Sequence, residues 1–228
     1  MTAYIFSLRH KKVVAAIKKV VLKHLSYYDE SLLWDFAQVA INNEKMRIEG
    51  VIIEAECGLG GSAITLAAAK SKDRIFYVYD VFSMHPSPSD DDGLDALERQ
   101  KVIETGKAQG IEGDLYYGYE KNLYDKVVQS FADFGLEVEK NHIYIKKGLF
   151  EDTLKVESPV SLAHIDCDWY DSVLTCLNRI EPHLVRGGTL IVNDYWLGCR
   201  KAVHKYFEKK NSGDYSFTKK AALFIVKR

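Results

Sequence analysis

The sequence lacks the features that mark several classes of protein. Its four cysteines are scattered and include no CxxC pair, so neither a zinc site of the usual spacing nor a disulfide framework is expected. No stretch reaches the run of about 20 apolar residues that a membrane helix needs. The opening residues, MTAYIFSLRHKK, contain no apolar run of signal-peptide length. These absences predict a cytoplasmic protein that does not contact a membrane.

The chain also has no excess of charge of one sign. It carries 31 basic and 32 acidic side chains, which gives a net charge of −1. Nucleic-acid binding needs a basic surface, so a nucleic-acid partner is not expected. Hydrophobic residues make up 47% of the 228 residues, which suffices for the core of one large domain, with or without a small extension.

The first 48 residues predict a helical extension. Residues 11–25 place apolar side chains at helical spacing with lysines between them, and residues 31–42 read as a second helix. A basic amphipathic helix can lie on a membrane surface, but packing on the main domain is the more ordinary arrangement. We therefore predict an extension over 1–48 and a main domain over 49–228. The apolar face of the first helix leaves pairing with a second copy of the chain open.

From residue 51 onward, short β-branched segments alternate with helical ones. This alternation predicts a Rossmann-like α/β fold, a mostly parallel sheet with helices on both faces. The last two strands are joined too tightly for a helical crossover, so they are expected to form an antiparallel hairpin at one edge. The predicted strands are 51–57, 74–80, 142–148, 162–168, 189–194, 215–220 and 222–228, and the predicted helices are 61–70, 94–109, 118–134, 172–184 and 199–210.

Glycines follow the first predicted strand, in EAECGLGGS (54–62). Gly58, Gly60 and Gly61 allow a sharp turn and a close approach of the backbone to a ligand, and the helix that starts there directs free N–H groups to the same place. Glu54 and Glu56 would repel a pyrophosphate but attract the ammonium and sulfonium groups of S-adenosylmethionine. This segment therefore favours S-adenosylmethionine over NAD, with a turn that binds no ligand as the alternative.

Asp80 ends the second predicted strand, 20 residues after Gly60. A carboxylate at this offset suits a ribose diol, because it accepts two hydrogen bonds in parallel. An ordinary surface acid is the alternative.

Polar residues also end two later strands. Asp166 and Asp168 close one strand, and Asn193 and Asp194 close the next. Consecutive strands are usually neighbours, so these oxygen atoms are expected to converge on a hard cation, with Mg²⁺ first and Ca²⁺ or Mn²⁺ after it. The alternative is a structural network satisfied by backbone amides. His164, just before these acids, is expected to be a buried structural residue.

A divalent cation beside a methyl donor has a chemical use. A metal-bound hydroxyl has a lowered pKa and a fixed oxygen, and a nearby carboxylate can take its proton. Asp168 is the candidate base, and Asp166 could exchange roles with it.

Several motifs in order resemble the macrocin O-methyltransferase-like (TylF) family of class I S-adenosylmethionine-dependent methyltransferases. The resemblance runs from about Glu49 to Val203. The matching positions are EAECGLGGSA, then Asp80, Phe82 and Pro86, then Gly148, Phe150, Asp152, Thr153 and Leu154, then Asp166, Asp168, Tyr170 and Ser172, then Gly187, Gly188, Asp194 and Tyr195, and last Gly198, Cys199, Arg200, Ala202 and Val203.

The resemblance implies a seven-stranded sheet of order 3-2-1-4-5-7-6 with the last strand antiparallel. It also implies that Ser62 and Phe82 belong to the cofactor site. The metal would be held by Asp166 or Asp168, position 193 and Asp194. Asn193 stands where the family usually has Asp, so the site has one negative charge fewer.

The sequence thus predicts an S-adenosylmethionine-dependent and Mg²⁺-dependent O-methyltransferase. Its expected acceptor is a hydroxyl of a sugar or another small natural product. A metal-independent methyltransferase and a non-catalytic S-adenosylmethionine-binding module remain alternatives, and an NAD enzyme is a weaker one.

Overall fold

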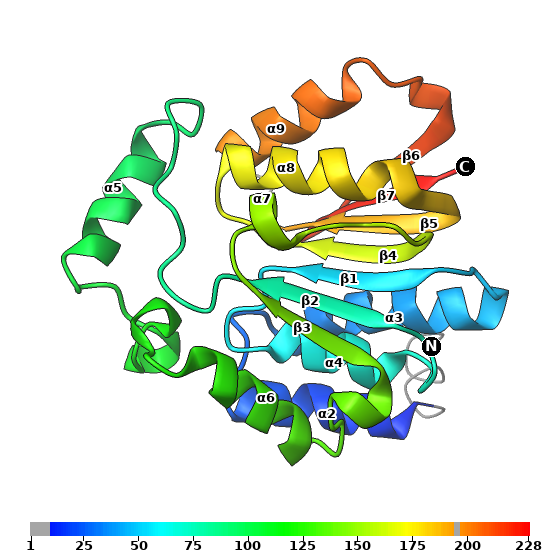
Figure 1. Ribbon diagram of the computed structural model, residues 1–228, viewed down its shortest axis with the longest axis horizontal. Coiled ribbons are helices and arrows are strands. Elements are labelled where there is room, and N and C mark those ends of the chain that lie inside the picture. Colours follow the sequence, from blue (N-terminus) through cyan, green and yellow to red (C-terminus); the bar gives the residue numbers. More distant parts are fainter. Residues whose placement is uncertain (1–9, 194–196) are drawn as a thin grey trace.

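A seven-stranded sheet in the order β3-β2-β1-β4-β5-β7-β6 forms the centre of the computed structural model, which describes residues 10–193 and 197–228 (Figure 1). The first five strands are parallel, and β7 runs antiparallel to both β5 and β6. The predicted order and the edge hairpin are confirmed. The strands are β1 (Val51–Ala55), β2 (Phe76–Asp80), β3 (Ile143–Lys147), β4 (Val160–Ile165), β5 (Leu184–Val192), β6 (Tyr215–Lys219) and β7 (Leu223–Lys227).

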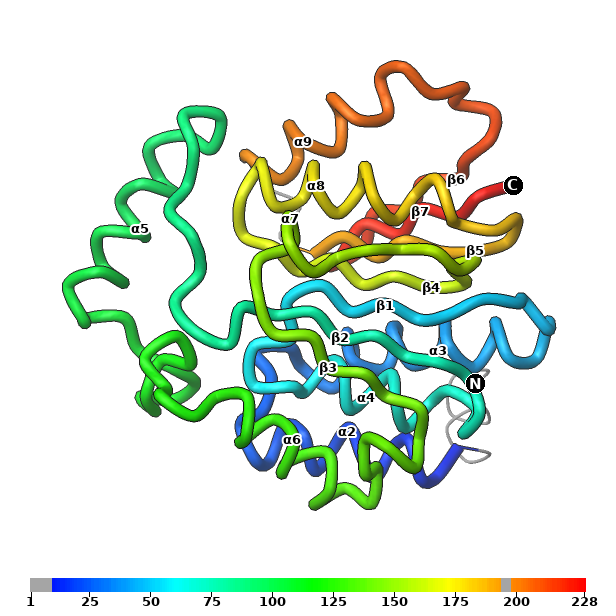
Figure 2. Tube along the Cα trace, in the orientation of Figure 1, coloured from blue at the N-terminus to red at the C-terminus, as the bar shows by residue number. Residues whose placement is uncertain are grey.

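Helices cover both faces of the sheet (Figures 1 and 2). One face carries α2 (Lys11–Leu22), α3 (Glu30–Met46), α4 (Gly61–Ala69) and α6 (Leu123–Asp133), and the other carries α7 (Phe150–Thr153), α8 (Tyr170–Ile180) and α9 (Leu197–Phe207). The helix α5 (Leu94–Glu104) stands apart, beyond the carboxyl ends of the strands. Short 3-10 turns are η1 (Ile111–Gly113), η2 (Tyr117–Tyr119), η3 (Glu139–Asn141), η4 (Glu181–His183) and η5 (Ser212–Asp214).

The central strands are buried on both faces, as expected for a parallel sheet between two helical layers. Every residue of β1 and β4 is buried. Successive side chains alternate between the faces, so Ile52 and Leu162 pack with α2, α3 and α4, whereas Ile53 and Ala163 pack with α8.

The two N-terminal helices share the core of the sheet. Ile17 of α2 and Leu33 and Phe36 of α3 are buried in the same cluster as Ile52. Asp29 caps α3, because its carboxylate accepts a 2.8 Å hydrogen bond from the Leu32 N–H. The segment before β1 therefore packs directly on the sheet, and the domain division at residue 48 stays a prediction.

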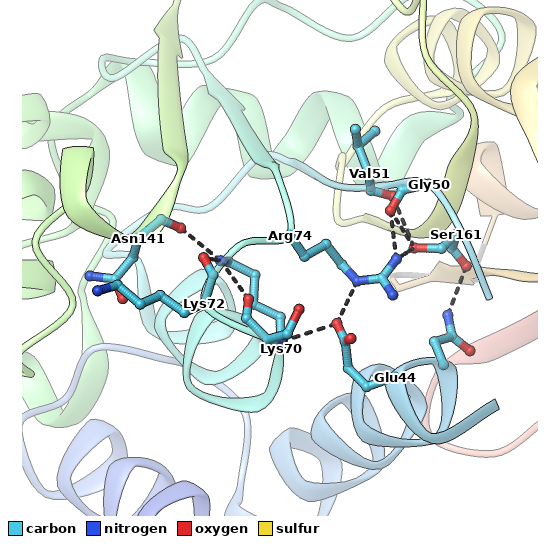
Figure 3. A network of polar contacts seen from close by, with 10 residues as sticks. Glu44, Gly50, Val51, Lys70, Lys72, Arg74, Asn141 and Ser161 are labelled. Atoms are coloured by element: carbon cyan, nitrogen blue, oxygen red, sulfur yellow. Dashed lines mark hydrogen bonds and ion pairs between the residues drawn. The ribbon is translucent and has the colours of Figure 1, made fainter. Parts of the chain in front are cut away.

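A charged network fixes the amino ends of the strands (Figure 3). The Arg74 guanidinium pairs with Glu44 of α3, and its Nη1 donates to the Gly50 carbonyl at 2.6 Å and to the Ser161 hydroxyl at 3.0 Å. Arg74 thus joins α3 to the residues at the starts of β1 and β4. This end of the sheet is held by polar contacts, and the opposite end holds the largest cluster of predicted site residues.

Two helices are shorter than their sequence patterns predict by five residues or more. The helix predicted over 94–109 ends at Glu104, because Gly106 has a φ of +72° and turns the chain out of the helix. The helix predicted over 118–134 begins at Leu123, after the 3-10 turn at Tyr117–Tyr119. Within the described parts of the chain, no helix has both the length and the apolar character needed to cross a bilayer.

Candidate active site

A cavity of about 230 Å³ opens at the carboxyl ends of β1 and β4. In an open parallel sheet this is the edge at which ligands bind. The segment before α3, the glycine loop after β1, the helix α5, the turn η2 and the acids after β4 all contribute to its wall. The lining residues are Leu25, Ser26, Tyr27, Tyr28, Glu56, Cys57, Gly58, Leu59, Ser62, Arg99, Tyr117, Asp166 and Asp168.

The glycine loop is fixed against the segment before α3. Gly60 has a φ of +92° and starts α4 from the left-handed region that favours glycine. The Gly61 N–H donates to the Leu25 carbonyl at 2.9 Å, and a Cβ at Gly61 would lie only 2.4 Å from that oxygen. Glycine is therefore required at position 61 by the close approach of residues 25 and 26.

Asp80 holds the same loop from the other side. Its Oδ2 accepts hydrogen bonds from the Cys57 and Gly58 N–H groups at 2.8 and 2.9 Å, and its Oδ1 accepts from the Phe82 N–H at 2.6 Å. Burial raises the pKa of Asp80, while these backbone hydrogen bonds lower it. Phe82 is buried and its ring packs edge-on against Tyr124. Both side chains support the loop, and their direct cofactor contacts stay predictions.

Glu54 lies behind the loop. Its side chain is fully buried and does not line the cavity. The Ser62 hydroxyl donates to it, and the buried His164 ring lies 3.1 Å from its Oε1. His164 is buried, as expected from the sequence. The structure thus gives Glu54 a supporting position, and its predicted contact with the cofactor stays a prediction.

Glu56 projects into the cavity from a backbone with a φ of +73°, an uncommon conformation for a residue other than glycine. Its Oε1 accepts a hydrogen bond from the Tyr117 hydroxyl at 3.2 Å. Burial raises the pKa of Glu56 well above its usual range, and the negative charges of Asp168, Asp80 and Asp166 add to this shift. A cationic ligand in the cavity would relieve that repulsion.

Two of the predicted metal ligands lie together after β4. The Asp166 N–H donates to the Ala55 carbonyl at 3.0 Å, and the Tyr28 hydroxyl donates to Asp166 Oδ1. Asp168 lines the same cavity, with its Oδ2 3.8 Å from His85 Nε2. Both carboxylates therefore face the space next to the glycine loop.

Asn193 is the next predicted ligand. Its N–H donates to the Ile165 carbonyl at 2.9 Å, which places it beside the residue that precedes Asp166. The side chain is only 4% exposed, and its Oδ1 has no hydrogen-bond partner within residues 10–193 and 197–228. This amide oxygen is therefore able to accept a hydrogen bond or to contact a cation. Asp194, the fourth predicted ligand, lies outside the described residues.

The donor set suits a hard cation. Asp166, Asp168 and Asn193 offer only oxygen atoms, as Mg²⁺ prefers. In the described portion, no three His, Cys, Asp or Glu side chains are grouped so that they could hold a metal ion. That grouping counts neither the amide of Asn193 nor the carboxylate of Asp194. The metal site therefore stays a prediction, and the oxygen atoms of Asp166, Asp168 and Asn193 suit a hard cation.

His85 was not identified from the sequence, although the loop that carries it was. The Trp169 indole N–H donates to His85 Nδ1 at 3.2 Å and to the Pro86 carbonyl at 2.8 Å. His85 Nδ1 also lies 3.3 Å from the Pro86 carbonyl oxygen, and its Nε2 lies 3.1 Å from the Tyr116 hydroxyl. Burial lowers the pKa of His85 and favours the neutral imidazole. These contacts hold His85 and Pro86 beside Trp169 and Asp168, which follow β4.

Tyr28 and Arg99 also reach the cavity without a signal in the sequence. Tyr28 precedes the cap of α3, and Arg99 lies within α5. Neither stands at the end of a strand, where the sequence analysis looked for site residues.

Comparisons of the sequence identify a family and two relatives that are similar to this chain. The family model described as macrocin-O-methyltransferase (TylF) matches residues 32–214. Mycinamicin III 3''-O-methyltransferase of Micromonospora griseorubida is 27% identical over 175 residues, 73% of this chain and 64% of that protein. A tetracenomycin-type rhamnosyl 4'-O-methyltransferase of Streptomyces olivaceus is 34% identical over 85 residues, 36% of this chain and 32% of that protein. The chain thus spans less than two thirds of the length of either relative.

Solved structures share the fold. The O-methyltransferase NovP superposes with a TM-score of 0.71 at 22% identity, over 89% of this chain and 81% of NovP. The calicheamicin methyltransferase CalS11 superposes with a TM-score of 0.60 at 16% identity, over 97% of this chain and 90% of CalS11.

Proposed function

Because the chain belongs to the macrocin O-methyltransferase (TylF) family, we propose that it transfers a methyl group from S-adenosylmethionine to a hydroxyl of a sugar or another small natural-product acceptor, assisted by a divalent cation. One observation carries the proposal. A single cavity is bordered by the glycine loop after β1 and by the carboxylates of Asp166 and Asp168 after β4. Donor and acceptor could therefore meet in one space. Buried thiols at all four cysteines suit the proposed cytoplasmic location.

The donor is proposed to bind along the glycine loop. Gly58, Leu59 and Ser62 line the cavity at the start of α4. Burial raises the pKa of Glu56, and the charges of Asp168, Asp80 and Asp166 raise it further, so these acids give the cavity a negative potential. The ammonium and sulfonium groups of S-adenosylmethionine would meet that potential favourably, whereas a pyrophosphate would be repelled.

Asp166, Asp168, Asn193 and, from the sequence, Asp194 are the residues proposed to hold the cation. When bound, Mg²⁺ would lower the pKa of the acceptor hydroxyl and fix its oxygen. Tyr28 supports this role, because its hydroxyl donates to Asp166 Oδ1 and orients that carboxylate.

Asp168 is proposed to take the proton of the acceptor hydroxyl on a carboxylate oxygen. The acceptor oxygen then bonds to the methyl carbon as the bond from carbon to sulfur breaks, leaving S-adenosylhomocysteine. The chain contributes the alignment of oxygen, carbon and sulfur, and the loop at His85 shields the reacting groups from water. Asp166 is the alternative base if the two acids exchange roles.

The test compares Asp168→Asn with Asp171→Asn, an exposed acid in the first turn of α8. Methyl transfer from labelled S-adenosylmethionine is measured on a panel of glycosides, and affinity for S-adenosylhomocysteine is measured by calorimetry. We expect Asp168→Asn to lose at least about 100-fold in turnover with cofactor affinity unchanged within a few-fold, while Asp171→Asn stays active.

Three outcomes would contradict the proposal. Full turnover after removal of divalent ions with a chelator would favour a metal-independent methyltransferase. Cofactor binding without methyl transfer to any hydroxyl of the panel would indicate a non-catalytic binding module, and tighter binding of NAD than of S-adenosylhomocysteine would indicate a different enzyme class.

A further inference from the structure

Arg99 gives the acidic cavity one positive charge. The other ionisable groups in its wall include Glu56, Asp166 and Asp168, and Arg99 is the only Lys, Arg or His side chain among the described residues that line it. It comes from α5, the helix that stands beyond the carboxyl ends of the strands (Figure 1). Arg99 therefore faces the cavity from outside the sheet.

The guanidinium of Arg99 makes no direct polar contact with the described parts of the protein. Across residues 10–193 and 197–228 it forms neither a hydrogen bond nor an ion pair, although Asp95 lies four residues earlier on the same helix. That spacing would suit an ion pair on the helix surface. Arg99 lines the cavity instead, with its donors available to a ligand.

The charge of Arg99 acts inside the cavity wall. Burial raises the pKa of Tyr27, and the positive charge of Arg99 opposes that shift. Burial lowers the pKa of His85, and Arg99 lowers it further. Tyr27 precedes α3 and His85 belongs to the loop after β2, so Arg99 lies where these two segments approach each other.

We propose that Arg99 binds an anionic group of the acceptor, a phosphate or a carboxylate, while a sugar hydroxyl of the same molecule lies at Asp168. This inference rests on the proposed methyl transfer and names the class of acceptor. A guanidinium binds either anion through two parallel hydrogen bonds. The acids in the rest of the wall repel an anion, so Arg99 fixes where the charged end of the acceptor lies and which way the sugar points.

The carboxylate of the donor is the other anion that could reach this cavity, and the experiment separates the two. Calorimetry in the presence of S-adenosylhomocysteine measures the binding of TDP-rhamnose, methyl α-rhamnoside and methyl glucuronoside, and methyl transfer to each is measured separately. The variants are Arg99→Gln and Lys101→Gln. Lys101 is an exposed cation on the same helix that does not line the cavity, so its variant controls for the loss of one charge.

We expect the wild-type protein to bind at least one of the charged probes about tenfold or more tightly than the neutral rhamnoside. Arg99→Gln should abolish that preference, Lys101→Gln should retain it, and affinity for S-adenosylhomocysteine should be unchanged in both. The two charged probes distinguish a phosphate from a carboxylate. Arg99-dependent binding without methyl transfer would support this inference while the proposed function fails.

Equal affinity for charged and neutral probes, including no measurable affinity for any of them, would overturn the inference. A loss of affinity for S-adenosylhomocysteine in Arg99→Gln, with acceptor binding unchanged, would assign Arg99 to the donor instead. Methyl transfer to the neutral rhamnoside that is as efficient as to the charged probes would overturn it while leaving the proposed function intact.

Discussion

Single residues decide how closely the segment before α3 can approach the glycine loop. Gly61 and Gly58 belong to the same loop but meet different surroundings. A Cβ at Gly61 would lie 2.4 Å from the Leu25 carbonyl oxygen, whereas a Cβ at Gly58 would have no heavy atom within 4 Å. Alanine substitutions at these two positions therefore compare a crowded site with an open site in the same loop.

We expect Gly61→Ala to lower the free energy of unfolding by about 2–3 kcal/mol, because the backbone must separate to admit the methyl group. The affinity for S-adenosylhomocysteine should fall with it. Gly58→Ala should cost only about 1 kcal/mol, the penalty for its positive φ. Urea unfolding and calorimetry measure both effects, and equal losses in the two variants would refute the steric explanation.

Residues at strand ends could be predicted from the sequence, and those outside them could not. Asp166 and Asp168 were identified because position after a strand directs a side chain to the binding edge of the sheet. Tyr28 contacts Asp166 across 138 residues of sequence, and Trp169 contacts His85 across 84. No local pattern encodes such contacts, because they depend on how distant segments pack.

One buried carboxylate adds to the pairing of β5 with β7 in anchoring the C-terminal hairpin to the rest of the fold. Glu181 of η4 is 1% exposed and accepts hydrogen bonds from Tyr206, Lys210, Tyr215 and Lys227. These donors come from α9, the residues after it, β6 and β7. Burial alone would raise the pKa of Glu181, but the hydrogen bonds outweigh that effect and hold the pKa at about 2.

A folded-state pKa below the unfolded value means that the contribution is present above about pH 4.5 and is lost as the pH falls toward 2. We expect Glu181→Gln to lower the free energy of unfolding by roughly 2 kcal/mol at pH 7. The difference from wild type should shrink at pH 3. Glu208→Gln, which alters an exposed pair with Lys205, is the control and should change the stability by less than about 0.5 kcal/mol.

Chemical denaturation at the two pH values measures this dependence. A deficit in Glu181→Gln that is as large at pH 3 as at pH 7 would show that its hydrogen bonds, and not its charge, stabilise the hairpin.

The molecule as a whole depends on its N-terminal helices. Leu33 and Phe36 of α3 cover the central strands, and Leu25 and Tyr28 line the cavity. Removal of residues 1–48 would expose this face of the sheet to water and remove one wall of the cavity.

We expect the fragment 49–228 not to unfold cooperatively and not to bind S-adenosylhomocysteine. Thermal unfolding followed by circular dichroism tests the first expectation, and calorimetry tests the second. A fragment with a sharp unfolding transition would support the domain division predicted at residue 48.

The architecture could be predicted because its signals are local and repeated. Strands that alternate with helices specify a parallel sheet, and the short link between β6 and β7 specifies a hairpin. The placement of α5 could not be predicted, because its charged sequence does not reveal that it stands apart from the sheet. Residues 1–48 were predicted as a helical extension, whereas their contribution to the cavity wall depends on tertiary contacts.

The separation of α5 from the sheet has a consequence for protein engineering. Residues 81–122 leave after β2 and return before α6, and they take no part in the pairing of β2 with β1 or β3. Gln109 and Leu115 bridge within the segment itself. We expect a chimaera that exchanges this segment between homologous enzymes to keep the strand pairing and to change the part of the cavity wall that Arg99 and Tyr117 form.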